Sequence, residues 1–240
     1  MGLLVTERQV VVPGEVLAEG IDFLPSNGTY RHQDKILADQ LGLLVIDGKV
    51  LKTIPLSGRY LPTRNDIIIG RVIDITMMGW RFELNSPYTA LLSMKEGSFD
   101  FIPKTANLQK YYALDDHAVL QIIKVTSQNL VDLTAKGPGL RKLKGGQIIK
   151  VNTHKVPRII GKNGSMVSML KKATGCKIIV GQNGLVWVSG EPQAEILTVN
   201  TLHKIENESH LPGLTEKIKK YLEEILGKKI EDGSEEHGDE

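Results

Sequence analysis

Three successive patterns of apolar and polar positions run along the chain. Up to about residue 62, short runs of Val, Ile and Leu alternate with Gly, Pro and Asn, and the Asp47-Gly48 pair between two of these runs is typical of a hairpin turn. Residues 63–140 carry five longer β-prone runs, and residues 141–228 mix short strands with stretches of helical spacing. The pattern predicts a multidomain chain that is mainly β first and α+β at its end.

The first predicted domain, residues 1–62, is a small β module. It shows no grouping of residues that resembles a catalytic site. Its apolar strands could form either a domain core or a docking face for another protein, and the pattern leaves both open.

The five runs of residues 63–140 are typical of a small five-stranded barrel. The segment of residues 94–117 is long enough for the short helix that often bridges two strands of such a barrel. The pattern alone leaves a generic β-barrel and an oligonucleotide-binding barrel open. Trp80 and Phe82, and Trp187 further along, lie inside strand runs, so we expect them to be core residues.

Residues 141–228 predict the order strand, helix, helix, strand, strand, helix, followed by one more helix. Pro157 suits a first helical turn, Gly175 suits a helix end, and Asn183-Gly184 suits a turn between two strands. The second, third and fourth of these helices each have an apolar face. The three faces comprise Met166, Met169, Leu170 and Ala173; Ile196, Val199, Leu202 and Ile205; and Leu214, Ile218, Tyr221, Leu222 and Ile225.

The net charge is +2, but the charged residues are distributed unevenly along the chain. The last eleven residues carry six of the 28 acids, so residues 1–229 hold 30 bases against 22 acids, and we expect residues 229–240 to form a disordered acidic tail. No Asp or Glu occurs between Asp132 and Glu191, a stretch with eleven Lys and Arg residues. A block of one sign indicates a polyanionic partner, because a solvated surface normally mixes signs.

The remaining side chains argue against metal, cofactor and redox chemistry. A single cysteine, Cys176, rules out an internal disulfide, and the six histidines lack the spacing of metal ligands, so we expect no cofactor.

No run reaches the roughly 18 apolar residues of a membrane span and no signal-like segment opens the chain, so we expect a cytoplasmic protein. Asp115, Asp116 and His117 form the one tight cluster of candidate catalytic residues, which turn and strand-entry roles explain better than nuclease chemistry.

The sequence IIGKNGSM holds two glycines, Gly161 and Gly164, separated by Lys162 and Asn163. If two helices meet there, unpaired backbone N–H groups and a helix N-terminus lie at one exposed point, which attracts phosphate oxygens. The glycines let a sugar-phosphate strand approach closely, Lys162 adds a charge, and Asn163 tolerates a left-handed turn. A nucleoside-triphosphate loop needs a different order of Gly, Lys and Ser or Thr, so ATP or GTP binding is not expected. The alternative is a plain connector between two helices.

This loop and the order of elements across residues 146–209 resemble a type I KH domain, whose Gly-X-X-Gly loop clamps about four nucleotides. The preceding runs then resemble an S1-type barrel, one of the oligonucleotide-binding folds. The positions that often carry base-stacking aromatics in such barrels look like Met78, Arg81 and Ser93 here, which favours attraction to the RNA backbone. The resemblance predicts RNA contacts at Lys155, Arg158, Gly161, Lys162, Asn163, Gly164, Lys171 and Lys172 in the KH domain and at Arg71, Arg81, Lys136 and Arg141 on the barrel.

A β module, one S1-type barrel and one KH domain in this order resemble the RNA-binding cap subunits of the archaeal exosome. The resemblance implies a non-catalytic protein, in three copies, alone or mixed with another cap protein, on a hexameric ring of RNase PH-like subunits. It implies recruitment of single-stranded RNA with A-rich 3′ ends, more efficient degradation, and docking of the N-terminal domain on the ring. A regulator of transcription or translation built from the same modules is the alternative, and capture of its partners would distinguish the two.

Overall fold

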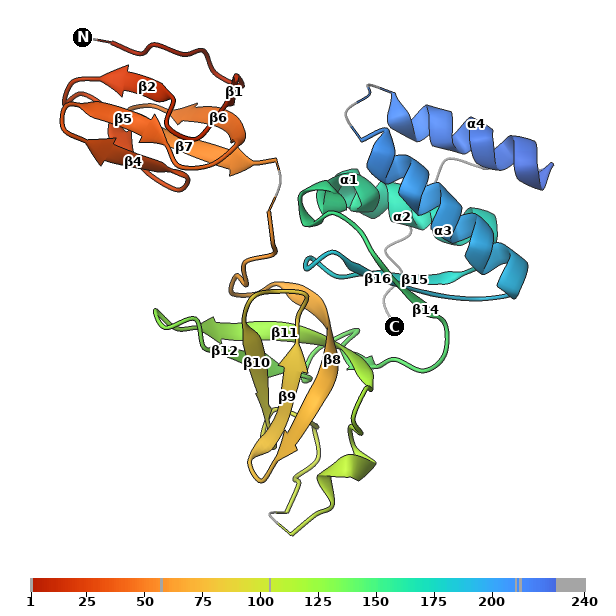
Figure 1. The fold of residues 1–240 in the computed structure, drawn as a ribbon. Coiled ribbons are helices and arrows are strands. Elements are labelled where there is room, and N and C mark those ends of the chain that lie inside the picture. Colours follow the sequence, from red (N-terminus) through yellow and green to blue (C-terminus); the bar gives the residue numbers. More distant parts are fainter. Residues whose placement is uncertain (1, 57, 104, 210, 212, 228–240) are drawn as a thin grey trace. The chain divides into compact units, whose positions relative to one another are not determined.

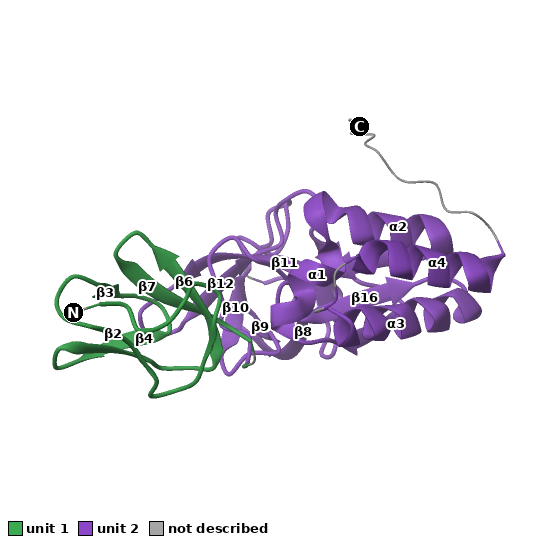
Figure 2. Cartoon of the chain, turned by 90° about the horizontal axis from the view of Figure 1, so that it is seen from above, with its two compact units in different colours: residues 1–58 green, residues 59–240 purple. Residues whose placement is uncertain are grey.

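The computed structural model describes residues 2–56, 58–103, 105–209, 211 and 213–227. The predicted acidic tail, residues 229–240, lies outside them. The chain divides into two compact units, residues 1–58 and residues 59–240 (Figures 1 and 2).

The first unit is built from two small β-sheets with one apolar core. The sheets have the strand orders β1-β6-β7-β3 and β2-β5-β4. β6 and β7 pair in antiparallel register across a tight turn at Gly48, whose φ is +60°, so the hairpin predicted from Asp47-Gly48 is confirmed. Leu17, Ile36 and Leu44 are fully buried in the core. The strands are β1 Val10–Val11, β2 Val16–Glu19, β3 Leu24–Pro25, β4 Thr29–His32, β5 Lys35–Ala38, β6 Gly42–Asp47 and β7 Val50–Pro55.

The second unit begins with a closed five-stranded β-barrel. β12 pairs with both β10 and β11, which closes the order β12-β10-β9-β8-β11, and a short 3-10 helix, η1, lies between β10 and β11 as predicted. Trp80 and Phe82 are fully buried, and their rings meet Tyr112 edge-on with centroids 5.2 and 6.0 Å apart. The predicted barrel and its aromatic core are therefore confirmed. Its elements are β8 Ile67–Thr76, β9 Gly79–Glu83, β10 Thr89–Ser93, η1 Leu108–Lys110, β11 His117–Val125 and β12 Val131–Thr134.

The rest of the second unit is an α+β arrangement with the predicted order of elements. A three-stranded sheet, β14-β16-β15, carries α1, α2 and α3 on one side (Figure 1). The last helix, α4, packs against α2 and α3 through Leu214, Ile218 and Leu222. Before this part of the chain, β13 Arg141–Lys142 pairs with β11 at the edge of the barrel sheet. The elements of the α+β part are β14 Gln147–Lys150, η2 Thr153–Lys155, α1 Val156–Ile160, η3 Lys162–Gly164, α2 Ser165–Thr174, β15 Lys177–Val180, β16 Leu185–Ser189, α3 Pro192–Asn207 and α4 Leu214–Leu226.

The prediction of which α3 residues face the core is partly wrong. Leu202 and Ile205 are buried, but Ile196 is 58% exposed, and its place is taken by Thr198 and Thr201, both fully buried. The Thr198 and Thr201 hydroxyls donate to the carbonyls of Ala194 and Leu197, each at 2.7 Å, so neither is buried without a partner. On α4, Ile225 likewise lies outside the buried face, at 52% exposure.

Asn183 fastens the barrel to the α+β half of the second unit. Its fully buried side chain donates from Nδ2 to the carbonyls of Ile69 (2.7 Å) and Leu84 (2.8 Å). In return, the Asn85 amide donates to the Asn183 carbonyl at 2.9 Å. Below this network, Trp187 packs with Ile69, Val119 and Leu143 in an apolar cluster formed by both halves. Trp187 is buried as predicted, but it lies in this cluster between the barrel and the α+β half.

Candidate nucleic-acid interface

The loop between α1 and α2 depends on both of its glycines. Gly161 has a φ of +77°, and a Cβ there would lie 2.7 Å from the Met166 nitrogen, so only glycine fits. Gly164 has a φ of +78° and open space where a Cβ would be. Asn163 takes a left-handed turn at φ +52°, and its side chain and that of Lys162 are exposed. The loop therefore presents a charged and an amide side chain to solvent on a tightly fixed backbone.

Five of the predicted cations have no side-chain partner within the part of the chain that the structure describes. Three of them, Lys162, Lys171 and Lys172, are exposed residues of the loop and of α2. The other two, Lys136 and Arg141, lie after the last barrel strand, in the segment that leads to the α+β half. A cation that no carboxylate neutralises keeps its full attraction for phosphate, so these five form the strongest positive features of the predicted site.

The other four predicted cations form ion pairs or hydrogen bonds within the chain. Arg71 pairs with Glu83 (2.6 Å) and Asp115 (3.4 Å), and the hydrogen bond to Glu83 raises the pKa of the guanidinium further. Arg81 lies 3.7 Å from Asp74. The remaining two cations of this group brace α1 against the end of α3: Lys155 donates from Nζ to the carbonyl of Glu206 (2.8 Å) and Arg158 from Nε to that of Ser209 (3.0 Å). RNA contact by these four residues stays a prediction.

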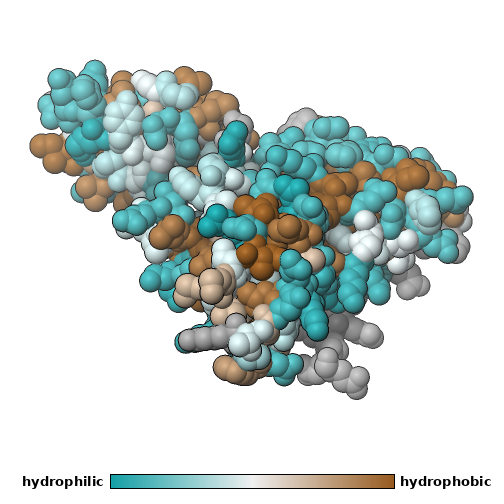
Figure 3. Space-filling model, turned by 60° about the horizontal axis from the view of Figure 1, so that its bottom comes forward, coloured by the Kyte–Doolittle hydropathy of each residue, from teal (hydrophilic) through white to brown (hydrophobic). Residues whose placement is uncertain are grey.

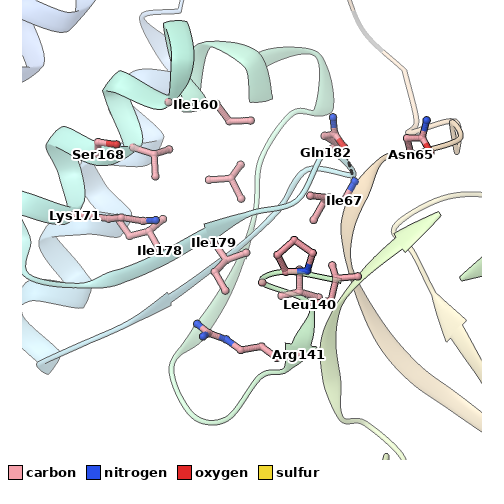
Figure 4. A pocket seen from close by; sticks show the side chains of 16 residues that line it. Asn65, Ile67, Leu140, Arg141, Ile160, Ser168, Lys171, Ile178, Ile179 and Gln182 are labelled. Carbon is pink, nitrogen blue, oxygen red and sulfur yellow. Dashed lines mark hydrogen bonds between the residues drawn. The ribbon is translucent and has the colours of Figure 1, made fainter. Parts of the chain in front are cut away.

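A pocket of about 590 Å³ lies beside the loop, between the KH-like half and the barrel (Figure 4). One wall comes from α1, α2 and β15, and Gly164 of the loop belongs to it. The facing wall comes from the start of β8, from Val119 on β11 and from residues 138–141. We call it the junction pocket. Lys171 and Arg141 both line it, so it brings together predicted residues from the two halves.

The Asp115, Asp116 and His117 cluster serves the structure of the barrel. Asp116 accepts from the backbone N–H of Ala113 at 2.5 Å and forms an ion pair with Lys142 on β13. Burial, followed by the charge of Arg71, lowers the pKa of His117 below its ordinary value. These contacts hold the turn before β11, in line with the predicted turn and strand-entry roles. Over the described ranges, no three His, Cys, Asp or Glu side chains come together as metal ligands, and no helix could cross a membrane.

Comparison with known proteins identifies the family. Residues 146–194 match the family model of the KH domain. The exosome complex component Rrp4 of Methanothermus fervidus is 41% identical over 221 residues, which cover 92% of this chain and 97% of the relative. The chain belongs to the Rrp4 family of exosome complex components. Rrp4 of Pyrococcus furiosus is 38% identical over 224 residues, covering 92% of this chain and 84% of the relative.

A solved structure supports the same assignment. It is described as that of an exosome complex RNA-binding protein, is 31% identical, and superposes with a TM-score of 0.62 over 70% of this chain and 97% of that chain. The recognised fold, with its β module, S1-like barrel and KH domain, is therefore that of the Rrp4 family.

Sequence reasoning missed an apolar end of the barrel. Met77 and Met78, in the turn between β8 and β9, are 92% and 74% exposed, and Phe99 and Phe101, in the loop after β10, are 76% and 88% exposed. Ser93 pairs with Gly79, so the turn and the loop leave the barrel at the same end. Figure 3 brings the lower side of Figure 1 forward and shows apolar surface there, interrupted by hydrophilic residues. The sequence did offer one signal for this apolar surface, since Phe99 and Phe101 lie outside any β-prone run.

Proposed function

We propose that this chain is a non-catalytic RNA-binding subunit that caps the exosome ring and recruits single-stranded RNA. The observation that carries the proposal is the group of unpaired lysines, Lys162, Lys171 and Lys172, on the KH loop and on α2, near Gly164, where no side chain covers the backbone. Positive charge without neighbouring acids attracts phosphodiester chains regardless of sequence. The name of the Rrp4 relatives supports the exosome as the setting.

Within that setting, the chain recruits A-rich 3′ ends, passes them to a hexameric ring of RNase PH-like subunits in the cytoplasm, and raises the efficiency of their degradation. Three copies sit on the ring, alone or mixed with another cap protein. Residues 1–62 dock on the ring, and residues 63–140 and 141–228 bind RNA. Residues 229–240 form an acidic tail.

Exposed apolar side chains on the first unit support its docking role. Ile21 is 82% exposed, Leu4 59%, Leu24 57%, and Val10 and Val12 about half. Exposed apolar side chains that lie together mark protein interaction sites, and we propose that these residues contribute to the docking face.

The contacts of the acidic residues before β11 support a non-catalytic role. Asp115 pairs with Arg71, and Asp116 with Lys142, and among the described residues no three His, Cys, Asp or Glu side chains come together to hold the metal of a metal-dependent nuclease. Purified chain incubated with labelled RNA is therefore expected to leave it intact.

Fluorescence anisotropy of a labelled single-stranded oligoadenylate, titrated with the full chain over a salt series, tests RNA recruitment. Binding should be measurable at low salt and should weaken steeply as salt rises, because each phosphate contact releases a counterion. An affinity that does not change with salt, or the absence of binding at low salt, would contradict the proposal.

A further inference from the structure

Three asparagines of this chain are followed directly by glycine: Asn27, Asn163 and Asn183. In such a pair, the backbone nitrogen of the glycine can attack the side-chain amide carbon of the asparagine, because glycine has no side chain to obstruct the approach. The nitrogen loses its proton, a bond forms from it to the amide carbon, and the amide group leaves as ammonia. Water then opens the cyclic succinimide to aspartate or isoaspartate. The net change replaces a neutral amide by a carboxylate.

The fold protects Asn183 from this reaction. Its side chain is fully buried, and its Nδ2 donates to the carbonyls of Ile69 (2.7 Å) and Leu84 (2.8 Å). The Gly184 N–H, which would attack, donates to the Gly181 carbonyl at 3.1 Å. The amide that would have to leave is therefore held by the barrel, and the water that would complete the reaction has no access to it.

Asn27 is exposed, but the backbone around it is fixed. The Asn27 carbonyl accepts from the Thr53 N–H at 2.8 Å, and the Gly28 carbonyl accepts from the Asp39 N–H at 2.9 Å. A Cβ on Gly28 would lie 2.4 Å from Gln40 Nε2 and 3.0 Å from Thr53 Cβ, so this glycine is closely packed. Closing the succinimide ring has to rotate the peptide between the two residues. Here that rotation breaks hydrogen bonds and meets neighbouring atoms.

Asn163 has neither form of protection. Its side chain is exposed and makes no hydrogen bond within the described part of the chain. The Gly164 N–H donates to the Gly161 carbonyl at 3.3 Å, which is long for a hydrogen bond, and a Cβ on Gly164 would meet no atom within 4 Å. Asn163 also holds a left-handed conformation (φ +52°, ψ +31°), which is unfavourable for a residue with a side chain. Of the three pairs, this one opposes ring closure least.

We propose that Asn163 is a deamidation site and that its conversion lowers the affinity of the chain for RNA as the protein ages. The effect on RNA rests on the proposed function, whereas the chemistry rests on the geometry of the loop. The new carboxylate lies next to Lys162, inside the stretch between Asp132 and Glu191 that holds no other acid, and a negative charge there repels phosphate. The isoaspartate product also adds a carbon atom to the backbone of the loop.

Peptide mapping by mass spectrometry, on the full chain incubated in mildly alkaline buffer, tests the modification. Asn163 should gain the mass difference between an amide and an acid first, Asn27 should follow more slowly, and Asn183 should keep its amide. The same incubation in guanidinium chloride is the control, because unfolding removes the protection and should let all three sites react at similar rates. If Asn163 reacts no faster than Asn27 or Asn183 in the folded chain, the proposal is overturned.

Anisotropy with a labelled oligoadenylate at low salt, on samples taken during the incubation, tests the effect on RNA. The converted chain should bind about threefold more weakly than the fresh chain, the scale of one lost phosphate contact. Asn163→Gln should keep the affinity of its own fresh sample, because its longer side chain has to close a larger ring, whereas the matched control Asn27→Gln should lose affinity as the unmodified chain does.

Converted chain that binds RNA as tightly as fresh chain, or an equal loss of affinity in Asn163→Gln, would overturn the proposal and leave the proposed function standing. If the fresh chain binds no RNA, the proposed function and the effect on binding both fall, and the peptide map still decides the modification.

Discussion

At the residue scale, the two loop glycines are required for different reasons. Both adopt positive φ, but only Gly161 has backbone atoms where a Cβ would be. The sequence could predict the need for glycine at such a turn. It could not distinguish the two positions, because the Met166 nitrogen that crowds Gly161 is brought there by the start of α2.

Gly161→Ala should therefore destabilise the chain by about 2 kcal/mol or more, from the left-handed conformation plus the steric clash. Gly175→Ala is the matched control, since Gly175 has φ +68° but open space around the missing Cβ, and it should cost only about 1 kcal/mol. Urea unfolding of both variants measures the difference. Equal losses would show that the contact with Met166 does not matter.

The exposed centre of the loop gives a prediction about binding rather than stability. Replacing Lys162 and Asn163 together by Asp should weaken RNA binding by about tenfold through repulsion of phosphate, with the thermal midpoint unchanged because both side chains are exposed. Lys217→Asp with Asn200→Asp makes the same charge change at exposed helical positions elsewhere in the second unit. Affinity that falls equally in both double variants would assign the effect to net charge and not to the loop.

Residue type predicted where the positive charges are, but not which of them are neutralised. Arg71 lies directly opposite Glu83 in the β8–β9 register, and Asp74 lies opposite Arg81. A bulge in β8 between Val72 and Asp74 sets the second pairing. Strand register of this kind depends on tertiary structure, so the sequence alone could not show that Arg71 and Arg81 have acidic partners.

At the element scale, the sequence predicted the order of strands and helices because periodicity is a local property. The junction between the barrel and the KH domain was not predicted, since Asn183 has the signature of an ordinary turn residue. Its partners, Ile69 and Leu84, lie about a hundred residues earlier in the chain. The face of α3 was partly misassigned for a related reason: threonines that bond to their own helix can replace isoleucine in a core.

Asn183→Ala should cost about 2–4 kcal/mol, because it leaves two buried carbonyls without donors. The free energy of unfolding in urea measures this loss. Gln182→Ala, at the exposed neighbouring position, removes one hydrogen bond and should cost about 1 kcal/mol. A loss at Asn183 no larger than at Gln182 would contradict a structural role for the buried amide.

At the scale of the whole molecule, the two compact units separate the two proposed tasks. Both units expose large apolar side chains, but the unpaired cations of the predicted site all belong to the second. The proposed function assigns RNA binding to the second unit and leaves degradation to a partner. Membership of the Rrp4 family names the complex in which that partner is to be sought.

The most direct measurement adds the full chain to a reconstituted phosphorolytic exosome ring and follows the decay of a labelled oligoadenylate. The account predicts that the ring degrades the RNA faster in the presence of the chain, and that the chain alone leaves the RNA intact. Decay by the ring that is unchanged when the chain is added, or cleavage by the chain in the absence of the ring, would contradict it.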